Sequence, residues 1–265
     1  MNRGQRVAAL ILVGWCVVAL AASVWPPPAN QIELRAILAP PTLATLAGRD
    51  DLGRDQLARL AAGARLSLTL AVIVVALTTA SATVIGVVAG WCGSWVDILL
   101  VRLIDIVLAF PGILLAIALA GVLGPGIGNV VLALTAVGWA GVARLVRAQT
   151  RSLRQRDHVQ VAHALGVSAP RVMLRHVLPL LAGPLLVEMT FAAAGVIVAE
   201  AGLSFLGLGV QPPTPSWGSM IRDGTRYLLV APHMVLVPGI ALASVVVAIN
   251  LLGDHLRDRW QPLRR

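Results

Sequence analysis

The sequence predicts an all-α integral membrane protein with about six transmembrane helices, and three observations support this class. Of the 265 residues, 58% are hydrophobic and only 12% are charged, about half the charged share of a typical soluble domain. Apolar runs recur along the chain and reach the roughly 20 residues that a helix needs to cross a bilayer core. The basic residues, all of them arginine, gather in short segments between those runs, as in the cytoplasmic loops of membrane proteins.

The apolar runs are expected to be helical, because a helix satisfies its own backbone polar groups inside lipid. We predict six spans, at about 7–25, 66–90, 97–121, 127–146, 177–200 and 231–252. An N-terminus on the inside places fourteen of the 21 arginines on the inner side and seven on the outer side. The positive-inside rule therefore predicts that both termini are cytoplasmic.

The first apolar run, Val7–Trp25, follows Arg3 and Arg6. A secretory signal peptide, which has the same pattern, is one interpretation of this segment. The run is longer than a usual signal core, so we expect residues 1–25 to be a retained transmembrane helix with a cytoplasmic N-terminus. Three prolines then follow at 26–28 and should stop this helix.

Residues 26–65 are expected to form an extracytoplasmic segment. Its end, 53–65, carries apolar residues at helical spacing, which predicts a helix lying along the outer membrane surface. The remaining chain is expected to be one membrane core over 66–265, with five transmembrane helices, an inner loop at 147–176, an outer loop at 201–230 and a cytoplasmic C-terminus.

A polar interruption at 144–179 separates two long apolar runs and holds seven arginines. It predicts a short helix, a turn at Gly166 and a second helix capped by Ser168. Three apolar residues are expected to share one face of the first helix: Val159, Ala162 and Leu165. Two interpretations stay open on these residues alone: a helix presented to a cytoplasmic partner protein, or a solvated loop held near anionic lipid by its arginines.

The stretch HVQVAHALGVSAPRVMLRHVLP, residues 158–179, resembles the EAA loop of bacterial ABC importer permeases. The matching positions are Ala162, Gly166, Leu178 and Pro179. Gln160 and Val161 stand where the family has the glutamate and the first alanine, so a possible ion pair with the ATPase is lost. The resemblance implies that a coupling helix docks on an ATPase through Gln160, Val161, Ala162, His163, Ala164, Leu165, Gly166 and Arg171.

Four further blocks, at 50–68, 95–117, 200–221 and 250–262, are similar to the dipeptide/oligopeptide/nickel permease family. They look most like the second permease subunit of dipeptide importers. The resemblance implies the ABC type I importer permease fold, with this chain forming half of a pore for di- or oligopeptides in the bacterial inner membrane. Nickel chelates, haem or another small solute are alternative substrates.

The same resemblance implies the partners. These are a homologous second permease subunit, two cytoplasmic ABC ATPases or one fused ATPase, an extracytoplasmic substrate-binding protein, and membrane lipid. ATP and Mg are expected to be used by the ATPase subunits, because this chain has no GxxxxGK[ST] phosphate loop. We therefore expect no cofactor bound by this chain and no enzymatic activity.

Other function classes receive little support from the sequence. The arginines follow the positive-inside pattern rather than a nucleic-acid-binding patch. The five histidines are scattered, the two cysteines are far apart, and neither set has metal-ligand spacing, so no metal site is expected. A stand-alone secondary transporter remains an alternative, and so does an intramembrane enzyme.

Glu188 lies deep in the fifth predicted span, where a carboxylate is costly unless it faces water or a partner. It is a candidate pathway residue that could meet the amino group of a peptide. The alternative is a structural glutamate, paired or protonated in the bundle.

Near the outer end of the same span, Glu200, Ser204 and Phe205 are candidates for a gate or for a structural helix end. Trp217 is expected at the membrane interface. Arg102 and Asp105 are expected to pair along one helix, and Gly253-Asp254 to end the last helix.

Overall fold

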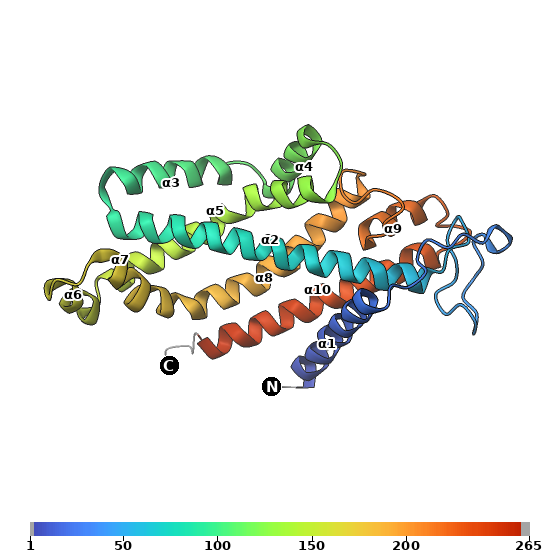
Figure 1. Cartoon of the computed structure of the whole chain (residues 1–265), viewed down its shortest axis with the longest axis horizontal. Helices are drawn as coiled ribbons and strands as arrows, with labels where there is room; N and C mark the ends of the chain where they lie inside the picture. The colour runs from blue at the N-terminus through green and yellow to red at the C-terminus, as the bar shows by residue number, and fades with distance from the viewer. Residues whose placement is uncertain (1–2, 261–265) are drawn as a thin grey trace.

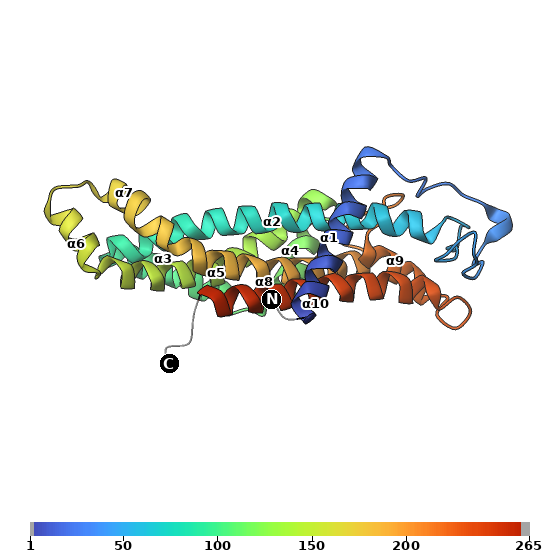
Figure 2. The same ribbon diagram turned by 90° about the horizontal axis from the view of Figure 1, so that it is seen from below.

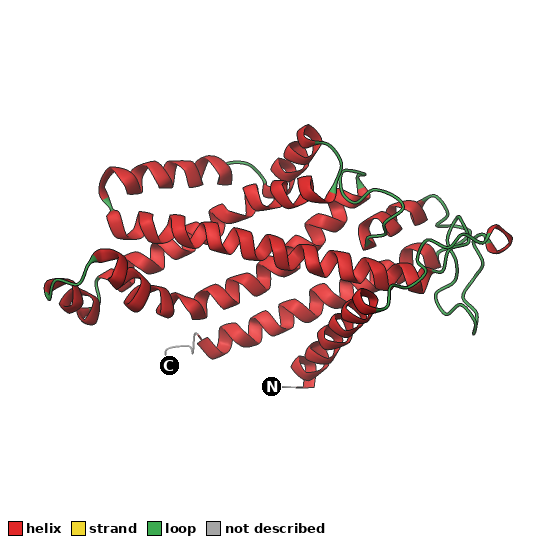
Figure 3. Cartoon of the chain, in the orientation of Figure 1, coloured by secondary structure: helices red, strands yellow, loops and turns green. Residues whose placement is uncertain are grey.

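The computed structural model describes residues 3–260, apart from the side chain of His163, and this part is a bundle of long helices (Figures 1 and 3). Its elements in chain order are α1 (Arg3–Val24), a 3-10 turn (Leu34–Ala36), α2 (Gln56–Cys92), α3 (Ser94–Leu108), α4 (Gly112–Leu123), α5 (Ile127–Arg154), α6 (Asp157–Ala164), α7 (Ala169–Val172), a π-helical turn (Met173–Val177), α8 (Leu178–Phe205), α9 (Trp217–Thr225) and α10 (His233–Trp260). Within residues 3–260, five helices are long and apolar enough to cross a membrane, and the α3–α4 pair can make a sixth span. The predicted all-α membrane class is confirmed. Arg264 and Arg265, counted above, lie outside the described residues.

The two ends of the bundle differ in what they carry. In both views, α6 and α7 form one end, and the segment between α1 and α2 lies with α9 at the other (Figures 1 and 2). The arginine-rich loop is therefore separated from the segments predicted to be outside by the length of the long helices.

The third predicted span, 97–121, is wrong as a single continuous helix. The chain breaks between α3 and α4, which are bent by 85° relative to each other. Pro111 explains the break, because proline lacks a backbone N–H and disfavours helical geometry in Phe110 before it. Pro111 itself has ψ 120° and precedes the first residue of α4.

The predicted surface helix at 53–65 is also corrected, because residues 56–65 form the first turns of the long helix α2. The Asp55 side chain accepts a hydrogen bond from the amide of Ala58 at 2.8 Å and starts the helix. Leu60 is buried, and its carbonyl accepts the indole N–H of Trp217 at 3.2 Å. Trp217 is fully buried and exposes no surface to lipid, because the hydrogen bond and the small face of α2 near Gly63 accommodate its ring.

Helix α1 is the most exposed of the long helices, and its Trp15 side chain makes a specific contact with the bundle. The Trp15 indole donates a hydrogen bond to the Ser244 hydroxyl of α10 at 3.0 Å. Its ring packs edge-on against Trp217, with centroids 5.1 Å apart. Leu10 and Leu20 remain mostly exposed on the other side, as suits a helix that faces lipid.

Two helices run further than predicted. The last eight residues of α5 lie in the predicted inner loop at 147–176, which therefore begins as helix. Helix α10 continues past Gly253-Asp254 to Trp260, so the predicted helix stop is wrong. A Cβ added at Gly253 would lie 3.1 Å from the Phe191 ring. Gly253 therefore allows close packing of α10 on α8 rather than ending the helix.

The acidic residues of α3 pair with α5 instead of with their own helix. Asp105 forms an ion pair with Arg144, with 2.5 Å between Oδ1 and Nη2, which corrects the predicted pair with Arg102. Both carboxylate oxygens of Asp97 accept hydrogen bonds from the guanidinium of Arg147, one of them at 2.7 Å. This two-point geometry holds α3 against the end of α5.

Helices α2 and α5 pack closely because glycines face the contact. A Cβ added at Gly86 would lie 2.6 Å from Cβ of Val146 and 2.7 Å from the carbonyl oxygen of Ala143. Real Cβ atoms do not come so near other heavy atoms, so a larger residue requires the two helices to separate.

Gly86→Ala should therefore destabilise the protein by about 1–3 kcal/mol, the usual cost of overpacking. Gly141→Ala is the matched control, because a Cβ there meets nothing within 4 Å. The control should be neutral or stabilising by about 0.5–1 kcal/mol, since alanine favours helix over glycine. Thermal unfolding midpoints in the same detergent compare the two variants, and equal midpoints would contradict the close contact.

Candidate functional site: the inner loop and the intramembrane cavity

The loop that follows α5 is folded rather than extended. Helix α6 is followed by Gly166, whose φ of +85° suits glycine and turns the chain away from the helix axis. Ser168 takes the extended cap conformation before α7 but makes no side-chain cap hydrogen bond. The predicted helix–glycine–helix arrangement is present.

The predicted common face of Val159, Ala162 and Leu165 is only partly right. Val159 and Ala162 are buried, but Leu165 is 79% exposed. Helix α6 ends at Ala164, so Leu165 lies in the turn before Gly166. Val161 is also exposed, and α6 with the turn after it therefore presents two large apolar side chains, Val161 and Leu165, to its surroundings.

The loop is joined to the bundle at the end of α5. Arg154 donates a hydrogen bond to the carbonyl of Trp91 at 2.7 Å, and its guanidinium carbon lies 5.6 Å from the centre of the Trp91 ring. This cation–π contact connects the ends of α5 and α2. A hollow of about 580 Å³ lies beside it, lined by residues of α2, α5 and α6, including Arg151 and Gln160.

The other candidate coupling residues lie on the same end of the molecule. Gln160 is exposed and donates a hydrogen bond to the Gln155 carbonyl at 3.3 Å. Ala164, Gly166 and Arg171 are exposed as well. The side chain of His163 lies outside the described part of the chain.

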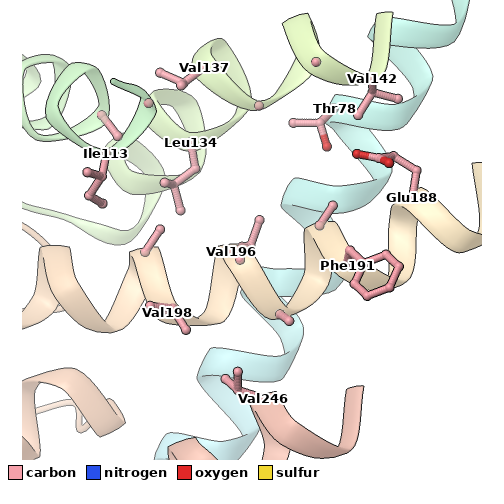
Figure 4. A pocket seen from close by; sticks show the side chains of 18 of the residues that line it. Thr78, Ile113, Leu134, Val137, Val142, Glu188, Phe191, Val196, Val198 and Val246 are labelled. Atoms are coloured by element: carbon pink, nitrogen blue, oxygen red, sulfur yellow. The ribbon is translucent and has the colours of Figure 1, made fainter. Parts of the chain in front are cut away.

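A second feature is a cavity of about 840 Å³ among the long helices (Figure 4). Its walls come mainly from α5 and α8, with contributions from α2, α4 and α10. Most of the lining is alanine, glycine, valine and leucine. The polar side chains that line it are Thr78, Glu188 and Asn250.

Glu188 lines this cavity, whereas Glu200, Ser204 and Phe205 do not. Glu200 is fully buried and accepts hydrogen bonds from Ser67 of α2 at 3.0 Å and from Ser204 at 2.7 Å. The Ser204 hydroxyl in turn accepts the amide N–H of Val210 at 3.2 Å. This network joins α2, α8 and the outer loop, which favours the structural alternative for Glu200 and Ser204.

Residues 82–265 match the model of the family described as the binding-protein-dependent transport system inner membrane component. The chain belongs to this family. It is a multi-pass membrane permease of an ABC importer, and the resemblance seen in the sequence is confirmed. The binding-protein-dependent system also implies partners, namely a substrate-binding protein and ATPase subunits.

Named relatives resemble this permease over most of its length. A putative peptide transport system permease protein of Brucella abortus is 41% identical over 98% of this chain and 88% of its own. The dipeptide transport system permease protein DppC of Alkalihalophilus pseudofirmus is 41% identical over 81% of this chain and 71% of its own. The glutathione transport system permease protein GsiD of Escherichia coli is 40% identical over 96% and 85%.

Several residues of the inner loop and the cavity were not identified from the sequence. Thr78 and Asn250 are polar residues inside apolar spans, which is a signal that could have marked them. The Arg154–Trp91 contact has no such signal, because the two residues are 63 positions apart and only the packing of α5 on α2 brings them together.

Proposed function

We propose that this permease forms half of a pathway that imports di- or oligopeptides and that its inner loop couples the pathway to ATP hydrolysis by partner subunits. The observation that carries this proposal is the pair of exposed apolar side chains, Val161 and Leu165, on a loop that is otherwise anchored in the bundle. Exposed apolar residues surrounded by polar ones are typical of a protein contact. The peptide substrate is suggested by the relatives, which are permeases of peptide, dipeptide and glutathione transport systems.

The buried face of the loop gives the coupling a physical route. Val159 and Ala162 belong to one apolar cluster with Leu153 of α5 and Leu181 of α8. Further along, the same two helices supply most of the cavity wall. Because close-packed side chains transmit displacement, a push on α6 by an ATPase should shift α5 and α8 and so reshape the cavity.

The proposal includes the partners. A homologous permease subunit would complete the pathway, two ABC ATPases or one fused ATPase would bind the inner loop, and a binding protein would deliver substrate to the opposite end. The ATPases would hold ATP and Mg, and this chain would be non-catalytic. Six passes, with α3 and α4 as one bent span, would place both termini in the cytoplasm.

A peptide substrate is favoured over nickel or haem by the cavity. Among the described residues that line it there is no histidine or cysteine, the side chains that most often ligate such metals. The anchored loop with an exposed apolar tip favours an ATPase-driven machine over a stand-alone secondary transporter.

The test is uptake of a labelled dipeptide into vesicles that contain this chain with the ATPases, second permease and binding protein encoded beside it. Uptake should require ATP and should be lost when this chain is omitted. An assembled complex that hydrolyses ATP but moves no peptide would overturn the proposed peptide substrate. Uptake that continues without the ATPases would overturn the proposed coupling to ATP hydrolysis.

A further inference from the structure

Glu188 is the charged side chain among the described residues that line the cavity, and its surroundings leave it without a partner. It is partly buried on α8, about 15 Å along the helix from Leu178 at 1.5 Å per residue. No hydrogen bond or ion pair joins it to another residue within the described chain. A carboxylate at such a depth is costly unless water or a cation meets it.

The polar neighbours do not supply that cation. In Figure 4 the Glu188 side chain extends from α8 toward Thr78 of α2 and Val142 of α5. The Thr78 hydroxyl donates to the carbonyls of Val74 and Val75 in its own helix, at 2.7 and 3.0 Å.

Asn250, the other polar residue of the lining, is similarly engaged, because its amide donates to the Val246 carbonyl at 2.8 Å. The Glu188 carboxylate therefore keeps its hydrogen-bond acceptors available to whatever enters the cavity.

The cavity has room for a small solute beside this carboxylate. Its volume of about 840 Å³ lies within the roughly 300–1,000 Å³ of small-ligand sites. A Cβ added at Gly141 or Gly195 of the wall would meet nothing within 4 Å. The walls therefore present bare backbone and small side chains, which restrict a passing molecule little, and one negative charge.

We propose that Glu188 is a substrate-contacting residue that receives the ammonium group of a peptide as it passes through the cavity. This inference rests on the proposed function and adds the part of the substrate that this chain recognises. The ammonium would be the cationic partner that the described residues lining the cavity do not provide to the carboxylate. The apolar wall tolerates varied peptide side chains.

The test uses the reaction rate of a thiol placed in the cavity to detect the charge of Glu188 and the binding of a peptide, so it does not rely on transport. Ala192 also lines the cavity, one helical turn from Glu188, so Ala192→Cys places a thiol beside the carboxylate. Cys16 and Cys92 are exposed free thiols and are first replaced by serine. The complete complex in inside-out vesicles is then treated with a cationic or an anionic methanethiosulfonate reagent, with Glu188 intact or as Glu188→Gln or Glu188→Asp.

The readout is the ratio of the reaction rate of the cationic reagent to that of the anionic reagent. With Glu188 intact, this ratio should be about three- to tenfold higher than in Glu188→Gln, the size of effect expected from one nearby charge in a wet cavity. Glu188→Asp should keep most of the preference. Saturating dialanine should slow the reaction, whereas N-acetyl-dialanine, which lacks the ammonium, should not, and Glu188→Gln should remove this difference.

Three results would overturn the proposal. An unchanged reagent preference in Glu188→Gln would show that the carboxylate does not face the pathway. Equal protection by both peptides would exclude ammonium recognition. A thiol at 192 that neither reagent reaches would show that the second permease covers this wall. Failure of dipeptide uptake by the unmodified complex would instead count against the proposed function, so the two failures are distinguishable.

Discussion

Replacing Leu165 by aspartate is expected to abolish binding of the ATPase subunits while leaving the permease folded. Leu165 is 79% exposed, so the substitution removes little packing within this chain. In the proposed complex the side chain enters an apolar site on the ATPase, where an unpaired carboxylate costs several kcal/mol. A loss of about 3 kcal/mol or more corresponds to at least a hundredfold weaker binding.

The measurement is co-purification of the ATPases with tagged permease, together with ATP-dependent dipeptide uptake. Leu43→Asp is the matched control, because Leu43 is 98% exposed and lies in the segment between α1 and α2, at the opposite end of the bundle. Both variants should elute as monodisperse permease, and only Leu165→Asp should lose the ATPases. Retention of the ATPases by Leu165→Asp would contradict the proposed coupling surface.

Replacing Glu200 by alanine is expected to cause the largest loss of stability. The substitution leaves the buried hydroxyls of Ser67 and Ser204 without their shared acceptor and opens a cavity at a site that has no exposed surface. Each orphaned hydroxyl costs about 1–3 kcal/mol, and the cavity adds to this. We expect a loss of roughly 3–5 kcal/mol, measured as a lower unfolding midpoint of the solubilised protein and lower yield in the membrane.

Glu188→Ala is the control for this change, because it removes the same side chain from the same helix at a position without a described hydrogen-bond partner. It should change stability by less than about 1 kcal/mol. The loss of stability in Glu200→Gln should lie between those of Glu188→Ala and Glu200→Ala, since the glutamine amide retains only one acceptor oxygen. Equal midpoints for Glu188→Ala and Glu200→Ala would show that the network contributes nothing.

The contrast between these two glutamates shows where sequence reasoning reaches its limit. Both are carboxylates in one apolar helix, and the sequence alone leaves a pathway role and a structural role open for each. Twelve residues separate them, which rotates the second by about 120° around the helix at 3.6 residues per turn. One side chain therefore lines the cavity, and the other meets Ser67 of α2.

The sequence by itself determined the features that depend on neighbouring residues. Hydropathy located the membrane-spanning runs, arginine spacing marked the inner loop, and Gly166 with the blocks around it indicated the family. These signals are local, because helix formation and lipid burial are satisfied within one segment.

Only the tertiary structure decided which partners those segments meet. Asp105 pairs with Arg144 rather than Arg102, and the Trp217 indole is buried against α2. Residues far apart in the chain make these contacts, and no periodicity encodes them. Such contacts depend on how closely two elements approach. The Trp217 ring, for example, lies against α2 where Gly63 has no side chain, and a Cβ there would be 3.1 Å from the ring.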